Sequence, residues 1–340
     1  MSNKKYFIIE FPKKEMNGGY GDRLVGIISI LSLSQIFNRH FLIKWDKEDI
    51  SSIFTYSNNY YNHTLNSKIK TIIVNSGKQL ENFNNKVNKK GILKIFDSDI
   101  CLFKTNMELV QSIQNSVSGI NYFDLLFNNY RNIYKKHIIL NDNILDLVYK
   151  VIGNRQKIIG IQVRTIYIDT IVNGQHMPDL WLGNKSNQAF ITLKNYFIPK
   201  LLNIKKHIEN NIKNYTIFIT ADNNYLIQFA KNIFNDVIFS DAEVMHIEWE
   251  RHGSNEKSKL REREKIKNYD NSSINDFNKN FIDHYILSTI CSNLYISTES
   301  NFGRTSALIN PTDNIYDIEC NIVNKKNLVS KRSINGDLLV

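Results

Sequence analysis

GGYGDRLVGIISILSLSQIFN, residues 18–38, joins a glycine-rich corner to a long apolar segment. The apolar spacing from residue 23 onward predicts a helix that is buried on nearly all sides. A short apolar run, YFIIEF at residues 6–11, precedes the corner and predicts a strand. A strand, a glycine corner and a buried helix in this order are typical of an α/β domain with a parallel sheet.

The glycine corner has more than one interpretation. Gly18, Gly19 and Gly21 would let a ligand approach the backbone amides where the helix begins. The spacing does not match the dinucleotide pattern G-x-G-x-x-G, and the corner could equally be a tight turn. Asp22 could contact a ligand or cap the helix.

Further short apolar runs recur along the chain and predict buried strands. In the first half they are HFLIKW (40–45), KTIIV (70–74) and GILKIF (91–96), and in the second half KIIGIQV (157–163), YTIFIT (215–220), DVIFS (236–240) and LYIS (294–297). Segments with helical spacing lie between several of them. Two such series that separate near residue 150 predict two doubly wound α/β domains, 1–152 and 153–340, packed around a cleft.

Composition narrows the class of protein. The 340 residues are 42% hydrophobic and 11% aromatic, which is typical of a folded globular protein. The net charge is +10, but the densest charged stretch, residues 256–267, mixes both signs, so we expect no nucleic-acid partner. The three cysteines, Cys101, Cys291 and Cys320, do not cluster, and the apolar run near residues 6–11 is too short for a signal-peptide core or a membrane span. We therefore expect a soluble cytoplasmic protein.

Two strand ends in the second half carry candidate binding residues, because ligands of open α/β sheets bind beyond the carboxyl ends of the strands. Arg164 follows the predicted strand in GIQVRT (160–165), where a guanidinium could bind a diphosphate bidentately or form a surface salt bridge with an acid such as Asp169. Asp222 lies at the end of the predicted strand in IFITADNN (217–224) and could accept hydrogen bonds from a ribose or base, or cap the next helix.

A third strand end leads into a polar loop, STESNFGRTS at residues 297–306, which enters the last long helix. Hydroxyls, backbone amides and Arg304 at a helix N-terminus predict an anion site. Asp97 and Asp99 have the D-x-D spacing of metal-dependent nucleotide-sugar transferases. Because the glycine corner and Arg164 lie elsewhere in the sequence, we expect no metal site at these aspartates.

Taken in order, four segments resemble the fucosyltransferases of the GT-B superfamily that contains the alpha-1,6-, alpha-1,2- and protein O-fucosyltransferases. The segments are GGYGDRLVGIISILSLSQIFNR (18–39), GIQVRT (160–165), IFITADNNYLIQFAKNIF (217–234) and FIDHYILSTICSNLYISTESNFGRTSAL (281–308). The resemblance implies a GT-B fold of two Rossmann-like domains that face a cleft. It also implies GDP-fucose as the donor, a glycan or glycoprotein acceptor, and no metal or other cofactor.

The resemblance also assigns roles to residues. Arg164 would bind the diphosphate, Asp283 the guanine, and Asp222 would lie near the ribose or guanine. Four residues would line the phosphate and fucose site: Ser300, Asn301, Phe302 and Gly303. Four more would face the donor from the first domain: Tyr20, Gly21, Asp22 and Arg23. Gln162 and Thr165 depart from the family, which often has a histidine and a second arginine at these positions.

Transfer of beta-linked fucose to an alpha product inverts the anomeric carbon, so the reaction needs a stabilised leaving group and a base. Arg164 is the candidate for the first role and Asp22 for the second, with His246 and Glu248 as alternative bases. We expect domain 153–340 to bind the donor and domain 1–152 the acceptor. Three other functions remain open: a GT-B-like transferase with another nucleotide sugar, a degenerate glycan- or nucleotide-binding protein, and a nucleic-acid-binding protein.

Overall fold

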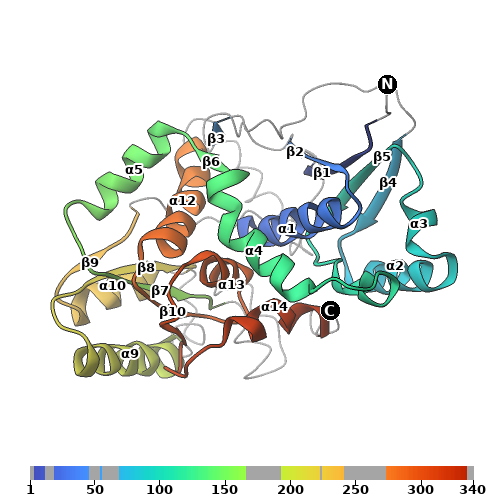
Figure 1. Ribbon diagram of the computed structural model, residues 1–340. Helices are drawn as coiled ribbons and strands as arrows, with labels where there is room; N and C mark the ends of the chain where they lie inside the picture. The colour runs from blue at the N-terminus through green and yellow to red at the C-terminus, as the bar shows by residue number, and fades with distance from the viewer. Residues whose placement is uncertain are drawn as a thin grey trace, which may run out of the picture. The chain divides into compact units, whose positions relative to one another are not determined.

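The computed structural model describes residues 4–11, 19–45, 54–55, 69–165, 193–222, 224–240 and 273–334. The chain divides into two compact units, one formed by Met1–Asn141 with Lys326–Val340 and the other by Asp142–Lys325. Each unit contains a parallel sheet with helices packed on it (Figure 1). Helix α5 (Asp142–Ile152) packs against α12 (Ser273–Tyr285) and so belongs to the second unit, one helix before the predicted boundary.

The sheet of the first unit is parallel and has the strand order β2-β1-β5-β4. Its strands are β1 (Tyr6–Phe11), β2 (His40–Trp45), β4 (Ile69–Val74) and β5 (Ile100–Thr105). A separate antiparallel pair joins β3 (Phe54–Thr55) to β6 (Ile139–Leu140). The helices are α1 (Tyr20–Ile36), α2 (Gly77–Lys90), α3 (Ile92–Ile95), the 3-10 helix η2 (Gln111–Ser116) and α4 (Tyr122–Lys136).

Helix α1 is buried on nearly all sides, as the apolar spacing predicts. It packs against β1, β2 and β5 and against α4. Hydrogen bonds pair the polar groups between α1 and α4: Asn129 Nδ2 donates to Ser32 Oγ at 2.8 Å and to Gln35 Oε1 at 2.9 Å. A Cβ at Gly26 would lie 2.3 Å from the backbone oxygen of Thr105. Glycine at this position therefore allows α1 to approach the end of β5.

The predicted strand 91–96 is wrong. Gly91 has φ +75° and ends α2, and the following residues form the helix α3. Ile92, Ile95 and Phe96 are buried at helical spacing, which a run of six residues does not distinguish from a buried strand. The strand lies just beyond it at β5, where Cys101 and Phe103 point into the core.

The sheet of the second unit is also parallel, with the strand order β11-β10-β7-β8-β9. Its strands are β7 (Ile158–Val163), β8 (Thr216–Ala221), β9 (Val237–Ile238), β10 (Asn293–Ile296) and β11 (Ile315–Asp317). Its remaining helices are the π-helix η3 (Leu193–Phe197), α9 (Ile198–Asn211), α10 (Asn224–Ile233), the π-helix η5 (Ile286–Ile290) and α13 (Asn301–Ile309); α14 (Lys325–Ile334) follows at the division between the units.

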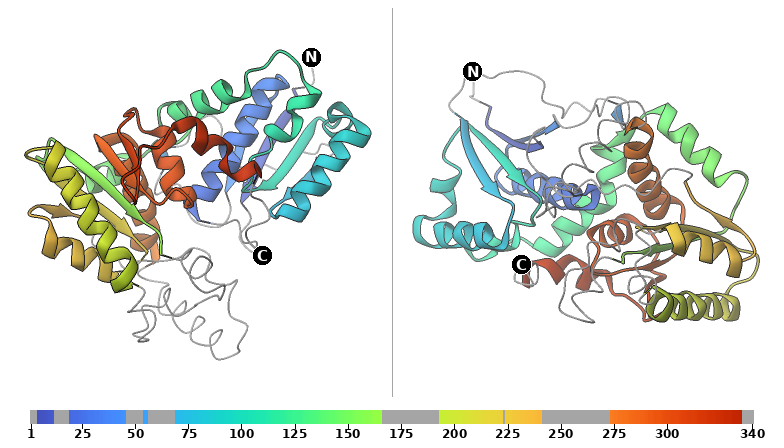
Figure 2. Two further views of the ribbon diagram at one scale, coloured as in Figure 1. Left: turned by 90° about the horizontal axis from the view of Figure 1, so that it is seen from below. Right: turned by 180° about the vertical axis from the view of Figure 1, so that it is seen from behind.

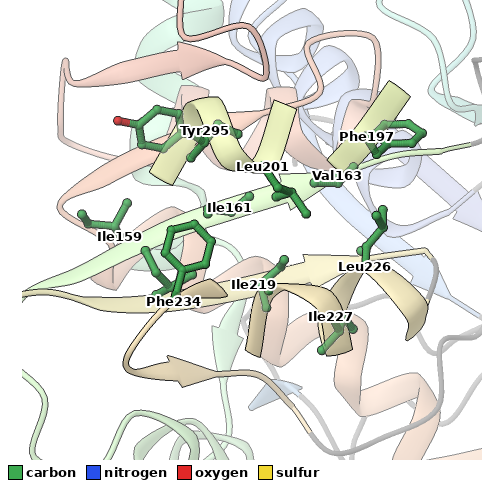
Figure 3. Close-up of a cluster of buried hydrophobic side chains, with 14 of the residues drawn as sticks. Ile159, Ile161, Val163, Phe197, Leu201, Ile219, Leu226, Ile227, Phe234 and Tyr295 are labelled. Atoms are coloured by element: carbon green, nitrogen blue, oxygen red, sulfur yellow. The ribbon is translucent and has the colours of Figure 1, made fainter. Parts of the chain in front are cut away.

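Helices cover both faces of this second sheet (Figure 2). On one face, Ile161 of β7 and Ile219 of β8 pack with Leu201 of α9 and Leu226 of α10 in a continuous apolar core (Figure 3). On the other face, η5 approaches β7 so closely that a Cβ at Gly160 would lie 2.7 Å from Leu287 Cδ2. Strand β7 is therefore buried on both faces, as its unbroken apolar sequence predicts.

We predict that Gly26→Ala destabilises the first unit, although alanine is the better helix former by about 1 kcal/mol. The added methyl group would overlap a backbone oxygen that cannot rotate away, so we expect a loss of about 2 kcal/mol of unfolding free energy. Urea denaturation followed by circular dichroism measures this loss. Glu81→Ala on the exposed face of α2 is the control and should change stability by less than about 0.5 kcal/mol. A Gly26→Ala protein as stable as the control variant would refute the close approach.

Candidate functional site

The strand order of the second unit reverses at β7. From β7 the chain builds β8 and β9 on one side, and later β10 and β11 on the other. Sheets with such a reversal bind ligands outside the carboxyl ends of the strands at that point. The candidate site is therefore the edge where β7 and β10 end.

Ser297 joins these two strand ends. Its N–H donates to the backbone oxygen of Gln162 at 3.0 Å, and its Oγ accepts from the N–H of Arg164 at 2.9 Å. The residue after β7 and the loop after β10 thus lie side by side. This places Arg164 next to the segment that leads into α13.

The N-terminus of α13 faces this edge through a short turn. Ser300 is the N-cap residue, and its N–H donates to the backbone oxygen of Ser297 at 2.9 Å. Asn301, Phe302 and Gly303 form the first turn, where helix N–H groups have no partner within the helix. Such an N-terminus attracts anions. The structure therefore brings Arg164 and the predicted residues 300–303 together.

Gln162 ties the same loop to β7. The residue is 3% exposed; Oε1 accepts from the N–H of Ser297 at 3.2 Å, and Nε2 donates to Ser300 Oγ at 3.5 Å. A Cβ at Gly303 would lie 2.4 Å from Gln162 Oε1, so glycine lets α13 pack directly on this side chain. This role of Gln162 is not among the sequence predictions, although a single polar residue in an otherwise apolar strand is a signal for it.

Asp222, at the end of β8, is bound to the residues that follow β7. Its carboxylate accepts the N–H of Thr165 at 2.9 Å and 3.0 Å and the Thr165 hydroxyl at 2.8 Å. Arg164 Nε lies 3.5 Å from Asp222 Oδ2. The predicted contact of Asp222 with a ribose or guanine stays a prediction.

Asp283 lies on α12 in a buried polar cluster near the ends of β8 and β9. It accepts hydrogen bonds from the hydroxyls of Thr220 and Ser240, and Lys279 Nζ lies 3.9 Å from Oδ2. Burial raises the pKa of Asp283, while Lys279 and the two hydroxyls act in the opposite direction. The predicted guanine contact is untested, and the carboxylate already has these protein partners.

His284 follows Asp283 and is fully buried. Its Nε2 lies 2.8 Å from Thr305 Oγ1, whose hydroxyl donates to the backbone oxygen of Asn301 at 2.6 Å. Nε2 therefore carries the hydrogen. Burial lowers the pKa of His284 to about 3, and its ring meets Phe302 edge-on at 5.0 Å. A neutral histidine thus supports the first turn of α13, a contact that the sequence pattern does not predict.

In the first unit, Gly19 caps α1, and Asp22 Oδ2 accepts its N–H at 3.1 Å. Tyr20 is buried against α4, where its hydroxyl lies 2.8 Å from that of Tyr134 and burial raises the Tyr20 pKa. Arg23 is fully buried, with its guanidinium carbon 4.9 Å from the ring centre of Trp45. For Tyr20 and Arg23, a direct donor contact would require the side chains to leave these positions. The predicted donor contacts of Tyr20, Gly21, Asp22 and Arg23 are untested.

Within the described ranges, no group of three or more His, Cys, Asp or Glu side chains could hold a metal ion. Asp97 instead pairs with Lys70 at 3.0 Å, and both Asp97 and Asp99 precede β5 at the amino edge of its sheet. In the same described ranges, no helix has the length and apolarity to cross a membrane. His246, Glu248, Gly18 and Asp169, and the charged stretch 256–267, lie outside the described residues.

No protein-family model and no curated protein sequence matches the chain. Solved fucosyltransferases share its fold. The NodZ alpha-1,6-fucosyltransferase soaked with GDP-fucose matches at a TM-score of 0.51 and 14% identity, over 91% of this chain and 94% of that chain. A mutant of Arabidopsis thaliana FUT1 in complex with GDP matches at 0.56 and 11%, over 92% of this chain and 70% of that chain.

At these identities the likeness concerns the fold. The chain has a GT-B fucosyltransferase-like α/β fold, which confirms the resemblance and the predicted fold class. The cleft between two domains stays a prediction.

We predict that His284 makes folding less favourable at acidic pH. Its folded-state pKa of about 3 lies below the unfolded value near 6.5, so below pH 6.5 the unfolded state gains a proton that the folded state does not. Stability should fall by about 2 kcal/mol between pH 7.5 and pH 5 from this group alone. His284→Gln, which can still donate to Thr305, should lose this part of the slope.

The measurement is the unfolding free energy in urea at pH 7.5, 6 and 5 for both proteins. His137, whose pKa burial also lowers, is present in both and cancels in the difference. Parallel pH profiles for the two proteins would contradict a buried neutral His284.

Proposed function

We propose that this protein is an inverting fucosyltransferase that moves L-fucose from GDP-fucose to a hydroxyl of a glycan or glycoconjugate. The observation that carries the proposal is the placement of Arg164 beside the N-terminus of α13 at the strand-order reversal. Solved proteins with this fold include fucosyltransferases crystallised with GDP or GDP-fucose, which supports the choice of donor.

A diphosphate fits the chemistry of this edge. The guanidinium of Arg164 offers paired N–H donors for phosphate oxygens, and the first turn of α13 offers backbone N–H groups with a partial positive charge. We propose that residues 300–303 line the phosphates and the fucose while Arg164 binds the diphosphate. No metal ion is needed in this scheme, because the arginine and the helix N-terminus supply the positive charge.

In the proposed reaction, the acceptor oxygen attacks the anomeric carbon as the bond from that carbon to the diphosphate oxygen breaks. The leaving GDP takes the bonding electron pair, and Arg164 stabilises the charge that develops on it. The acceptor loses its hydroxyl proton to a base. We propose Asp22 for that base, because its carboxylate is only partly buried at the start of α1.

Guanine presents two neighbouring N–H donors that match a carboxylate, and we propose Asp283 for this contact. Ser240 and Thr220 already donate to its two oxygens, each of which has a second lone pair. Because Asp283 is buried, this contact requires the residues that cover the carboxylate to move when the donor binds. The basic surplus of the chain, +10 overall, would raise the local concentration of an anionic donor. We propose an acceptor site in residues 1–152.

We predict that Arg164→Ala lowers kcat on the order of 100-fold or more, because it removes a preorganised donor at the leaving diphosphate. Calorimetric titration with GDP, UDP and ADP in EDTA should show a preference for GDP that Arg164→Ala weakens. Arg155→Ala is the matched control, because that arginine forms an exposed ion pair with Asp236. UDP binding that needs a divalent ion would overturn the proposal and indicate another nucleotide sugar.

We predict that Asp22→Asn lowers kcat about 100-fold or more with little change in GDP affinity, because the amide cannot take the acceptor proton. Asp124→Asn is the matched control: Asp124 occupies the same third position of α4 and pairs with Asn121 at 2.6 Å. Initial rates of fucose transfer from GDP-fucose give kcat for both. Near-normal transfer by Asp22→Asn would remove Asp22 from this role and leave His246 and Glu248 as candidates.

A further inference from the structure

Asp222 lies where three segments meet: the end of β8, which it directly follows, the residues after β7, and, through Arg164, the loop after β10. We infer that Asp222 is a positioning residue, which with Thr165 forms a clamp that fixes Arg164 for the diphosphate. This replaces the predicted contact of Asp222 with ribose or guanine. The inference rests on the proposed function only in that Arg164 must bind a nucleoside diphosphate.

Hydrogen bonds fix the backbone around Arg164 on both sides. The N–H of Arg164 donates to Ser297 Oγ at 2.9 Å, and the N–H of the next residue, Thr165, donates to both oxygens of Asp222 at 2.9 Å and 3.0 Å. The first bond comes from the β10 side and the second from the β8 side. The Cα of Arg164 is thus held at the end of β7 from two neighbouring strands.

The same carboxylate also orients the guanidinium. Asp222 Oδ2 lies 3.5 Å from Nε of Arg164, the nitrogen nearest the stem of the side chain. Because the guanidinium is planar, a contact at Nε sets the direction in which the rest of the group points. A fork that binds two phosphate oxygens depends on this direction.

The surroundings of Asp222 favour a clamp over a ligand contact. Its side chain is 6% exposed, against 23% for Arg164. The carboxylate accepts two hydrogen bonds from Thr165 N–H and one from the Thr165 hydroxyl, in addition to the arginine contact. A carboxylate turned toward a diphosphate would repel it, whereas one behind the arginine orients the binding group.

Thr165 supplies two of these donors from one residue. Its hydroxyl donates to Asp222 Oδ1 at 2.8 Å, and the residue is 1% exposed. Thr165→Val keeps the shape and removes the hydroxyl, while Thr165→Ser keeps the hydroxyl. The two variants therefore separate the hydrogen bond from the packing of the side chain.

The test uses the full chain and a double-mutant cycle between Asp222→Asn and Arg164→Ala, with the Kd for GDP from calorimetry and kcat and KM for transfer from GDP-fucose. Asp222→Asn and Thr165→Val should each lower kcat about 10-fold or more and change KM less, because outer positioning groups act through the group they orient. Thr165→Ser should restore most of the loss. In the Arg164→Ala background, Asp222→Asn should change kcat and the GDP Kd by less than about twofold.

A matched control lies at the opposite edge of the same sheet. Asp236, before β9, accepts from the Thr216 hydroxyl and pairs with Arg155 at 3.2 Å, so it repeats the arginine, threonine and aspartate arrangement away from the site. Asp236→Asn should leave kcat and the GDP Kd within about twofold of the wild type. Melting temperatures of all variants identify losses that come from unfolding.

Additive losses in the Arg164→Ala background would overturn the inference, because Asp222 would then contact the donor directly. Equal losses for Thr165→Ser and Thr165→Val would also overturn it. If the wild type binds GDP but transfers no fucose, the proposed function fails while the Kd cycle still decides the inference. If the wild type binds no nucleoside diphosphate, both fail.

Discussion

Strand β7 pairs with β8 on one side and β10 on the other, and every candidate donor residue in the second unit depends on this double pairing. Because both neighbours run parallel to it, their carboxyl ends meet at one edge, and Ser297 and Asp222 reach the residues after β7 from opposite sides. The faces of the strand impose a second constraint. Gly160 allows η5 to pack closely on β7, and Gly303 allows α13 to pack on Gln162. These two close approaches set how near α13 lies to the end of β7.

The buried polar groups around this edge are costly unless they are paired. Asp283 and His284, adjacent residues of α12, both show this cost. Burial raises the pKa of Asp283 and lowers the pKa of His284, so it disfavours the charged form of each side chain. Each has a protein partner that offsets part of the penalty, Thr220 for the aspartate and Thr305 for the histidine. Paired in this way, the groups rigidify the surroundings of the candidate site.

Local sequence pattern is sufficient to predict the strands that position the site. The apolar runs predict β7, β8 and β10 within a residue or two, so the pattern alone places Arg164 at a strand end and residues 300–303 in the segment that follows another. The same rule fails at residues 91–96, because a short apolar run suits a helical turn as well as a strand. Partners distant in the sequence cannot be predicted in this way. Thr165 meets Asp222 across 57 residues, and Arg23 contacts Trp45 only because β1 and β2 are adjacent.

The pairing of Arg164 with Asp222 changes how the charge of the site must be understood. A half-buried arginine without a carboxylate would be costly in the ligand-free protein, and Asp222 offsets that cost. In the proposed site, Asp222 would offset part of the charge that Arg164 presents to a diphosphate, and the N-terminus of α13 and the basic surplus of the chain would add to the attraction. Under the proposal, Arg164 would contribute direction and hydrogen bonds as well as charge. A carboxylate beside the arginine is then compatible with the proposed anion site, because Asp222 would hold the guanidinium in place while the N-terminus of α13 adds to the attraction.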